Sequence, residues 1–490
     1  MHIAHIAAEM APLVKVGGLG DVVGALPLAQ ARAGHQVTIV LPAYSRVLRE
    51  RQLFSPPSVP VSFRVGGNDV RGGVHTLAHH GVTVLLIEQN DFFGRDGVYD
   101  GPHGAFGDNG LRFGWFSGAA LAALREIVPA PDVIVAHDWP AALVPVLMRA
   151  QPQSFEAIAE TASALVIHNL AHQGVFTRDL ARRLGIADLF LDAGTLERDG
   201  NLNMLRGAIR CATCVITVSP TYAGEIVWPS FGEGLEEDLL ARGSDLVGIL
   251  NGIDTQIWDP KRDPHLAASF DAEDRSGKAL CKSALQQELG LRVDSSLPLF
   301  AVVSRVDRQK GLDLISPSAA WLVEQGAQLV LLGSGERGLI EPLYGLARTW
   351  KQSVVVIDRF DESLAHRIYA GGDFFLMPSR FEPCGLGQMV ALRYGAIPIV
   401  RRTGGLADTV RDIEEHADTG SGIVFDHADA GAVRWACERA LALWRTPHDR
   451  LEGIRARGMN LDFSWDRSAL LYDQLLERAV RAERRRVFAP

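Results

Sequence analysis

Short runs of apolar and β-branched residues recur along the chain, and they are hydrophobic at successive positions rather than at alternate ones. In the first half they cover residues 2–9, 35–42, 81–88, 132–138, 164–169 and 214–219. In the second half they cover residues 299–305, 327–335, 353–360, 374–380, 397–405 and 422–426. Such continuous runs are typical of parallel strands that helices cover on both faces. The pattern therefore predicts parallel β-sheets.

Segments with helical spacing of apolar residues lie between these runs, for example DVVGALPLAQARAG and GLGQMVALRYG. Alternation of strand and helix predicts an α/β fold. The predicted strands are too many for one open sheet, and the segment LVGILNGIDTQIWDP carries Asn-Gly and Asp-Pro turn signals. We therefore expect two Rossmann-like, doubly wound domains at residues 1–248 and 249–460, followed by an amphipathic helix at residues 461–490.

Composition and charge narrow the class of protein. The 490 residues are 47% hydrophobic, which is enough for large cores. A net charge of −9 argues against general nucleic-acid binding. No apolar run approaches the roughly 18–20 residues that cross a bilayer, and no secretory signal begins the sequence. Five cysteines without disulfide-like spacing indicate a reducing compartment. We expect a cytoplasmic protein that binds neither nucleic acid nor membrane.

The glycine-rich segment KVGGLGD, at residues 15–21, follows the first predicted strand and leads into a helical pattern. Glycines at the start of a helix let backbone N–H groups face an anion. The segment is not a dinucleotide fingerprint, because Val23 occupies the sixth position counted from Gly18, and no P-loop sequence occurs in the chain. Lys15 favours an anion site over a purely structural turn.

Two later segments combine charge with strand ends. In VSRVDRQKGLDL, Arg305 and Lys310 follow a strand, and both side chains suit phosphate oxygens, although solvated surface charges are the alternative. In MPSRFEPCGLGQ, Glu382 precedes glycines that open a helix. Glu382 could accept hydrogen bonds from sugar hydroxyls or stabilise a developing positive charge. Alternatively, it could be an acid at a helix N-terminus that interacts favourably with the helix dipole. The adjacent acid disfavours a thiolate at Cys384, so we do not expect that residue to be a nucleophile.

Histidines and one aspartate lie at two strand ends in the first half. Asp138 belongs to AHDW, and His168 belongs to IHNLAHQG. His137 and His172 are expected to converge with them. A zinc site would need H-E-x-x-H or paired C-x-x-C motifs, and the single CATC at residues 211–214 suits a core strand instead. No D-x-D motif supports a carboxylate-held magnesium ion, so we expect no metal and no cofactor.

The motifs KVGGLGD, AHDW, IHNLAHQG, TVSPTYAGEI, NGID, SRVDRQKGLDL, PSRFEPCGLGQ and RRTGGLADTV occur in that order. Together they resemble those of the bacterial and plant-type glycogen and starch synthases, which are retaining glucosyltransferases that use ADP-glucose. The resemblance covers nearly the whole chain. It implies the GT-B fold, with two Rossmann-like domains facing an inter-domain cleft and a C-terminal helix that returns to the N-terminal, acceptor-side domain.

The resemblance also implies roles for individual residues. ADP-glucose would be bound by Lys15, Gly18, Asp21, Asn251, Arg305, Lys310, Glu382, Gly385 and Leu386. The implied catalytic residues are His168, Glu382, Arg305, Lys310 and Asp138. Arg305 and Lys310 would stabilise the departing ADP, and His168 would lie beside the anomeric carbon. The chain departs from the usual family pattern at Pro140, at Arg206 and at Ala208.

The implied reaction transfers glucose from ADP-glucose to the non-reducing end of an α-1,4-glucan such as glycogen, with retention, and releases ADP. Retention allows either double displacement through a carboxylate or front-face attack in which the leaving phosphate accepts the proton. The family favours the second route, and the sequence leaves both open. The alternatives are another donor such as UDP-glucose, a phosphorylase, or a catalytically silent glucan-binding protein. The sequence does not indicate an oligomeric state.

Overall fold

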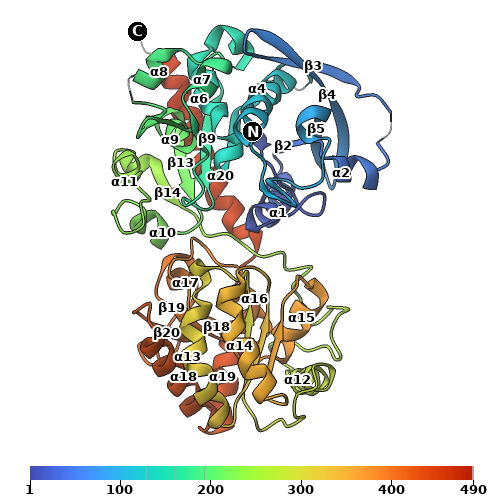
Figure 1. The fold of residues 1–490 in the computed structure, drawn as a ribbon, viewed down its shortest axis with the longest axis vertical. Helices are drawn as coiled ribbons and strands as arrows, with labels where there is room; N and C mark the ends of the chain where they lie inside the picture. Colours follow the sequence, from blue (N-terminus) through green and yellow to red (C-terminus); the bar gives the residue numbers. More distant parts are fainter. Residues whose placement is uncertain (54, 128–129, 159, 193, 488–490) are drawn as a thin grey trace. The chain divides into compact units, whose positions relative to one another are not determined.

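The computed structural model describes residues 1–490 except 54, 128–129, 159, 193 and 488–490, so the last three residues of the predicted C-terminal helix lie outside the described part (Figure 1). The chain forms two compact units. The first comprises Met1–Val218, Ala223–Gly252 and Trp465–Pro490, and the second comprises Ser219–Tyr222 and Ile253–Ser464. Each unit is built around its own parallel sheet.

The first unit contains a nine-stranded sheet in the order β14-β13-β9-β8-β1-β2-β5-β4-β3. Its strands are β1 (His2–Ile6), β2 (Gln36–Pro42), β3 (Val59–Val65), β4 (Asn68–His79), β5 (Val82–Glu88), β8 (Val133–His137), β9 (Ala162–Ile167), β13 (Cys214–Thr217) and β14 (Leu246–Gly248). The strands from β14 to β5 are parallel, as the apolar runs predict. The order reverses at β1, which lies between β2 and β8, and such switch points are the usual ligand sites of open α/β sheets.

Helices and two small sheets complete this part of the chain. The helices are α1 (Gly18–Arg32), α2 (Ser45–Glu50), α3 (Asn90–Phe93), α4 (Asn109–Ile127), α5 (Asp138–Ala141), α6 (Leu143–Ala150), α7 (Asp179–Arg183), α8 (Asp188–Asp192), α9 (Met204–Cys211), α10 (Pro220–Glu225), α11 (Glu236–Leu240) and α20 (Trp465–Val487). The small sheets pair β6 (Asp100–Gly101) with β7 (Gly104–Ala105), and β12 (Asn201–Asn203) with β10 (Val175–Thr177) and β11 (Glu197–Arg198).

The edge of the large sheet differs from the prediction of parallel strands alone. β3 and β4 form an antiparallel hairpin, and β4 is also antiparallel to β5. In β3, buried residues alternate with exposed ones. A strand with one solvated face lacks a continuous apolar run, so the apolar runs of the sequence do not predict this hairpin.

The C-terminal helix α20 is part of the first unit. It packs against α1, β8 and β9, and Tyr472 and Leu476 are buried in the same hydrophobic core as Val135 and Val166 (Figure 1). At its other end, the buried Glu483 binds the guanidinium of Arg149 at 3.0 Å. Residues from the end of the sequence therefore stabilise the sheet formed by its beginning.

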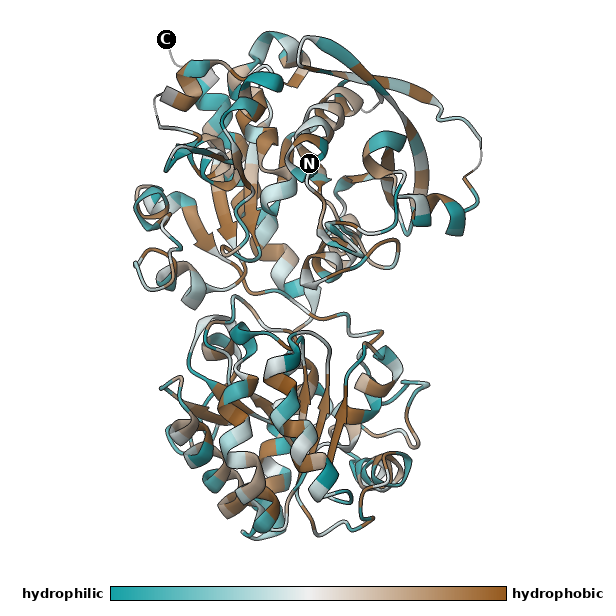
Figure 2. Ribbon diagram, viewed as in Figure 1, coloured by the Kyte–Doolittle hydropathy of each residue, from teal (hydrophilic) through white to brown (hydrophobic). Residues whose placement is uncertain are grey.

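The second unit contains a six-stranded, fully parallel sheet in the order β17-β16-β15-β18-β19-β20. Figure 2 shows hydrophobic strands in this unit and helices that carry both hydrophobic and hydrophilic residues. The strands are β15 (Leu299–Val303), β16 (Gln328–Leu332), β17 (Val354–Ile357), β18 (Phe374–Met377), β19 (Ile397–Arg401) and β20 (Ile423–Phe425). The helices are α12 (Ser276–Glu288), α13 (Leu312–Glu324), α14 (Arg337–Thr349), α15 (Glu362–Gly371), α16 (Gly387–Arg393), α17 (Gly404–Thr409), α18 (Ala430–Trp444) and α19 (His448–Met459). None of the helices in the described part of the chain combines the length and apolar character needed to span a bilayer.

A buried ion cluster joins the helices of the second unit to its central strands. The carboxylate of Asp373, just before β18, lies 2.6 Å from Lys282 Nζ and 2.6 Å from an Arg455 guanidinium nitrogen. It also accepts a hydrogen bond from the backbone N–H of Leu299 at the start of β15. Burial alone would raise the pKa of Asp373, but the two cations lower this pKa below its ordinary value of 3.8. The charged form is therefore the one that stabilises the fold.

We expect Asp373→Ala to destabilise the second unit by about 3–5 kcal/mol, because Lys282 then remains buried without a counter-charge and Arg455 keeps only its pair with Glu452. The loss is measured as the shift in the urea midpoint of that unit. Since the pKa of Asp373 is lowered on folding, its contribution is complete above the ordinary carboxyl pKa and disappears as the pH falls through the lower folded-state value.

Glu438→Ala is the matched control, because Glu438 pairs with Arg434 on the exposed side of α18, where both side chains are about half exposed. Exposed pairs of this kind contribute about 0–1 kcal/mol. Equal urea midpoints for the two variants would contradict the importance of the buried cluster.

Candidate active site

The carboxyl ends of adjacent strands bring Lys310 and Glu382 together in the second unit. Lys310 follows β15 and Glu382 follows β18, and these strands are neighbours. Lys310 Nζ lies 2.8 Å from Glu382 Oε1 and 2.6 Å from Oε2. The hydroxyl of Ser379 donates a further hydrogen bond to Oε2 at 2.9 Å. The Glu382 carboxylate is buried, so these donors provide the compensation that a buried charge needs.

Glycines allow the three loops of this half-site to approach closely. Gly311 has a φ of 68°, and a Cβ there would collide with the carbonyl of Pro378. Gly404, at the start of α17, has a φ of 43°, and a Cβ there would collide with the carbonyl of Glu382. The N–H of Gly405 donates to that same carbonyl at 3.1 Å. Both positions therefore require glycine, for its positive φ and for the space it leaves.

The other predicted residues of the second unit occupy two different environments. Arg305 is more than half exposed and pairs with Asp307 at 3.4 Å, and the same Asp307 carboxylate accepts a hydrogen bond from the backbone N–H of Lys310 at 3.1 Å. Gly385, with a φ of 71°, and Leu386 precede α16. Within the described residues, their N–H groups donate to no protein acceptor. These two donors are thus available beside the loop that carries Glu382.

The glycine-rich segment of the first unit encloses a carboxylate of the chain itself. Glu9, buried at the end of the β1 segment, accepts hydrogen bonds from the N–H groups of Val16 and Gly17 at 2.6 and 2.9 Å. The hydroxyl of Tyr99 donates to its other oxygen at 2.7 Å. Burial and the nearby Glu9 raise the pKa of Tyr99, so the phenol keeps its proton for this bond. Glu9 was not predicted as a site residue, yet it holds the loop that presents Lys15.

Lys15, Gly18 and Asp21 lie on this loop and on the first turn of α1. Lys15 Nζ pairs with Asp21 at 2.7 Å, and both side chains are about one-third exposed. A Cβ at Gly17 or Gly18 would meet no protein atom within 4 Å. Packing inside the protein therefore does not require glycine at these positions, whereas a ligand lying against the backbone would.

Asp138 holds the turn that carries His168. These residues follow the neighbouring parallel strands β8 and β9. Asp138 has a φ of 52°, which is unusual for a residue other than glycine, and it accepts a hydrogen bond from the backbone N–H of His168 at 2.7 Å. Burial raises the pKa of Asp138 to about 7, although the N–H groups of His168 and Asn169 oppose this effect. Asp138 therefore acts on the backbone of His168.

Three histidine side chains form a hydrogen-bonded stack behind this turn. His5 Nδ1 lies 3.0 Å from His137 Nε2, and His137 Nδ1 lies 3.0 Å from His168 Nε2. Burial lowers the pKa of His5 to about 4, that of His168 to about 3, and that of His137 well below its ordinary value. The rings are therefore neutral near pH 7. Within the described chain, no three His, Cys, Asp or Glu side chains are grouped so that they could hold a metal ion.

Asn251 is buried in the first unit with 5% of its surface exposed. Its Oδ1 has no hydrogen-bond partner among the described residues. A buried acceptor without a partner is unfavourable, so this atom is suited to a donor that the protein does not supply.

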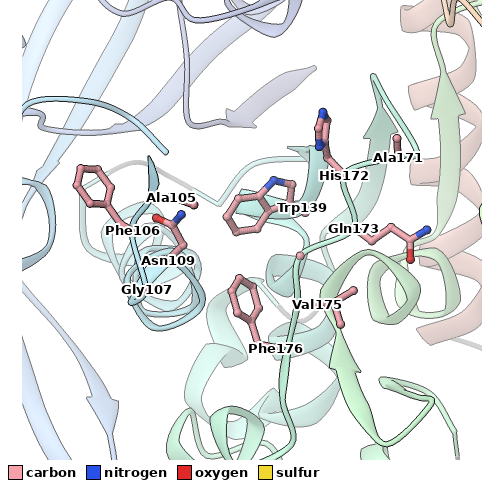
Figure 3. A pocket seen from close by; sticks show the side chains of 11 residues that line it. Ala105, Phe106, Gly107, Asn109, Trp139, Ala171, His172, Gln173, Val175 and Phe176 are labelled. Carbon is pink, nitrogen blue, oxygen red and sulfur yellow. The ribbon is translucent and has the colours of Figure 1, made fainter. Parts of the chain in front are cut away.

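An aromatic-lined pocket of about 490 Å³ opens beside Asp138 in the first unit. Figure 3 shows the indole of Trp139 between the side chains of Asn109, Phe176 and His172. Trp139 and Phe176 also contact each other, with ring centroids 5.8 Å apart. The sequence pattern predicts His172 among the convergent residues but gives no indication of Trp139 or Phe176. Trp139 lies on α5 and Phe176 on β10, and elements so far apart in the sequence leave no spacing signal.

The departures from the family pattern have a structural explanation at one position. Arg206 Nε donates to Asp238 at 2.6 Å, and another guanidinium nitrogen bonds the carbonyl of Glu197. Arg206 therefore stabilises the packing of α9 in this chain. Ala208 and Pro140 are buried.

Comparison with family models supports the resemblance on which the residue roles depend. The model described as starch synthase catalytic domain matches residues 2–241. The model described as glycosyl transferases group 1 matches residues 298–442. The first region contains Lys15, Asp138 and His168, and the second contains Lys310 and Glu382.

Full-length relatives extend the comparison. The chain is 40% identical to a glycogen synthase of Syntrophotalea carbinolica over 98% of this chain and 99% of the relative. It is 44% identical to a glycogen synthase of Anaeromyxobacter sp., over 97% and 98% of the two chains. It is 40% identical to a glycogen synthase of Bacillus subtilis, over 99% of each.

A solved structure agrees with these relatives. The catalytic domain of starch synthase IV from Arabidopsis thaliana, bound to ADP and acarbose, matches with a TM-score of 0.89 and 35% identity, covering 98% of this chain and 99% of that one. This match confirms the predicted GT-B fold with its Rossmann-like units. The full-length identities confirm the resemblance read from the motifs, and the chain belongs to the glycogen and starch synthase family of glycosyltransferases.

Proposed function

We propose that the protein transfers glucose from ADP-glucose to the non-reducing end of an α-1,4-glucan, with retention of anomeric configuration and release of ADP. The observation that carries the proposal is the buried Glu382 carboxylate, bound by both Lys310 and Ser379 beside two available backbone N–H groups. A cation, a carboxylate and N–H donors together suit a sugar diphosphate. The family supplies the identity of the sugar and nucleotide.

The second unit, taken as residues 249–460, is the proposed nucleotide-binding domain. Lys310 and Arg305 stabilise the negative charge that develops on ADP, and the N–H groups of Gly385 and Leu386 bind phosphate or sugar oxygens. One well-aimed donor contributes about 3–4 kcal/mol to such a transition state. Glu382 contacts the transferred glucose. Its bonds to Lys310 position both groups before substrate arrives.

The first unit, taken as residues 1–248 with the helix of residues 461–490, contributes the proposed acceptor side and part of the donor site. Lys15, with Asp21 as its counter-ion, approaches the diphosphate, and the open backbone at Gly18 allows close contact. His168 lies beside the anomeric carbon. Asn251, just beyond residue 248 but grouped with this unit in the structure, accepts a hydrogen bond from the substrate at Oδ1. The five cysteines are thiols in this structure, which suits a reducing cytoplasm.

Front-face attack is the route that this carboxylate arrangement favours. A double displacement needs an ionised carboxylate aimed at the anomeric carbon. Asp138 accepts backbone hydrogen bonds, and its pKa is raised to about 7, so much of it is protonated near neutral pH. Both oxygens of Glu382 are already bound by Lys310. In the front-face route the departing phosphate accepts the proton of the acceptor hydroxyl, and no protein nucleophile is required.

The aromatic-lined pocket around Trp139 is the proposed binding site for the glucan acceptor. Its indole and the ring of Phe176 offer apolar faces, while Asn109 and Gln173 offer amide groups. A sugar ring has both apolar C–H faces and polar hydroxyls, so this combination fits one well. Trp139 directly follows Asp138 in the sequence, and Ala171 and His172 in the pocket lining follow the turn of His168.

A donor panel tests the proposed reaction. We expect radiolabelled glucose to enter glycogen from ADP-glucose far faster than from UDP-glucose, and the labelled linkage to be α-1,4. Product analysis by α-1,4-specific digestion checks the linkage. Faster transfer from UDP-glucose, or no incorporation from either donor, would contradict the proposal.

Glu382→Ala should lower kcat about 100–1,000-fold, the effect of removing one well-placed electrostatic group. Lys310→Ala should lower kcat and also raise the KM for ADP-glucose, because Lys310 binds the diphosphate in the ground state as well. Steady-state kinetics at saturating glycogen separate the two effects.

Glu341→Ala provides the control for these variants, since Glu341 is an exposed acid on α14 of the same unit. Its kinetics should equal those of the unmodified protein. Turnover near the unmodified level in a folded Glu382→Ala variant would remove Glu382 from the mechanism.

Trp139→Leu should raise the KM for glycogen about tenfold and leave the KM for ADP-glucose unchanged, because a lost aromatic contact corresponds to about 1.5 kcal/mol or more. Trp228→Leu is the matched control, because Trp228 is 66% exposed and lies outside the pocket. Thermal unfolding establishes that both variants are folded. Equal glycogen KM values for the two variants would place the acceptor elsewhere.

A further inference from the structure

A chain of buried hydrogen bonds runs from the C-terminal helix to the proposed catalytic histidine. Gln30, on α1, donates from Nε2 to Asp473 Oδ1 on α20 at 3.0 Å. Gln30 Oε1 lies 2.8 Å from His5 Nε2. The path continues from His5 Nδ1 to His137 Nε2 and from His137 Nδ1 to His168 Nε2, each at 3.0 Å. The Asp473, Gln30, His5 and His137 side chains are each at least nine-tenths buried.

The carboxylate at one end gives this path a direction. Asp473 also pairs through its second oxygen with His35 Nε2 at 3.1 Å. Both carboxylate oxygens therefore accept hydrogen bonds. Burial raises the pKa of Asp473, while the bonds from Gln30 and His35 oppose this rise. In its ionised form the carboxylate can only accept, so the amide of Gln30 presents its NH2 group to Asp473 and its oxygen to His5. The reversed amide would place two acceptors against each other in a buried site, which is costly.

The hydrogen bonds of the imidazoles are directed in the same way. His5 must donate from Nε2 to the oxygen of Gln30. A neutral imidazole has one N–H, so His5 Nδ1 is an acceptor, and His137 must donate to it from Nε2. His137 Nδ1 is then an acceptor as well, and His168 must donate from Nε2. Burial lowers the pKa values of all three rings, which supports their neutral form.

Ring orientation is consistent with a preorganised array. The rings of His5 and His137 are stacked with centroids 5.3 Å apart, and those of His137 and His168 are stacked at the same distance. Neighbouring rings are inclined by 26° and 24°. Each ring is therefore held by stacking as well as by hydrogen bonds, through both nitrogens in His5 and His137 and through Nε2 in His168.

We propose that Gln30 and Asp473 are positioning residues for glucose transfer, which act through His5 and His137 to hold His168 as the Nε2–H tautomer. His168 then carries its lone pair on Nδ1 and offers substrate a hydrogen-bond acceptor rather than a donor. The proposal rests on the proposed role of His168 beside the transferred sugar. Through Asp473, α20 thus contributes to glucose transfer as well as to the hydrophobic core.

NMR of the full-length protein labelled with ¹⁵N-histidine tests the tautomers directly, because protonated and unprotonated ring nitrogens have distinct shifts. The chain has 15 histidines, and His168→Ala and His137→Ala spectra assign the two signals needed. We expect Nε2–H at both positions. Finding Nδ1–H at His168 would overturn the relay.

Gln30→Met removes the acceptor of His5 while keeping the side-chain length. We expect the His168 signal to move toward a mixture of tautomers. We also expect kcat to fall roughly tenfold with little change in either KM, a smaller loss than a direct partner of a catalytic histidine produces. An unchanged His168 tautomer would overturn the relay. A changed tautomer with unchanged kcat would overturn the positioning role.

A polarity-exchanged pair provides the rescue. In Gln30→Glu/Asp473→Asn, the new carboxylate accepts from His5 Nε2 and from the new amide, whose oxygen accepts from His35. The His168 tautomer and kcat should both return toward their original values, and persistence of the defect would contradict the proposal.

Glu483→Gln is the matched control, because Glu483 is a second buried acid on α20 that binds Arg149 and Thr213 outside the relay. It should lower stability without changing the His168 tautomer, and a tautomer change here would show that general loosening of α20 explains the effect. Absence of ADP-glucose transfer in the unmodified protein would refute the proposed function separately, and the NMR result would still decide the relay.

Discussion

Parallel strands all end at the same edge of a sheet, and this constraint places every loop of the candidate site. In the first unit it brings the segments after β1, β8 and β9 together, and in the second it does the same for the segments after β15, β18 and β19. Residues far apart in the sequence, such as Lys310 and Glu382, become direct partners in this way. The helices that cover both faces of the sheets leave this edge as the place where polar groups can face a ligand.

Burial then decides the chemical state of the groups at these edges. The stacked histidines lose affinity for protons because their charged forms are poorly solvated there. The same effect raises the pKa of Asp138 to about 7. Glu9 and Glu382 are equally buried, but each is surrounded by donors that stabilise a carboxylate. The buried groups are therefore of two kinds: the stacked imidazoles, which are neutral, and the carboxyl groups of Glu9 and Glu382, which accept hydrogen bonds from nearby donors.

The C-terminal helix connects packing with this chemistry. α20 contributes Tyr472 and Leu476 to the first core, and from the same helix Asp473 reaches the amide of Gln30. A carboxylate is an unambiguous acceptor, so its effect on hydrogen-bond direction extends through groups that could each be arranged in two ways. Stability and the orientation of His168 therefore depend on the same helix.

The sequence by itself determined the α/β class, the central parallel strands and the segments that carry Lys15, Asp138, His168, Lys310 and Glu382, because buried strands and their polar ends leave local patterns. The hairpin β3–β4 was not predicted, because buried and exposed residues alternate along β3, whereas the parallel strands are continuous apolar runs. Only the tertiary structure decided which groups meet: Glu9 with the glycine-rich loop, Ser379 with Glu382, and Gln30 with both Asp473 and His5. It also paired Arg305 with Asp307. These pairings join distant segments across loops and helices, and no periodicity along the chain encodes a contact made through space.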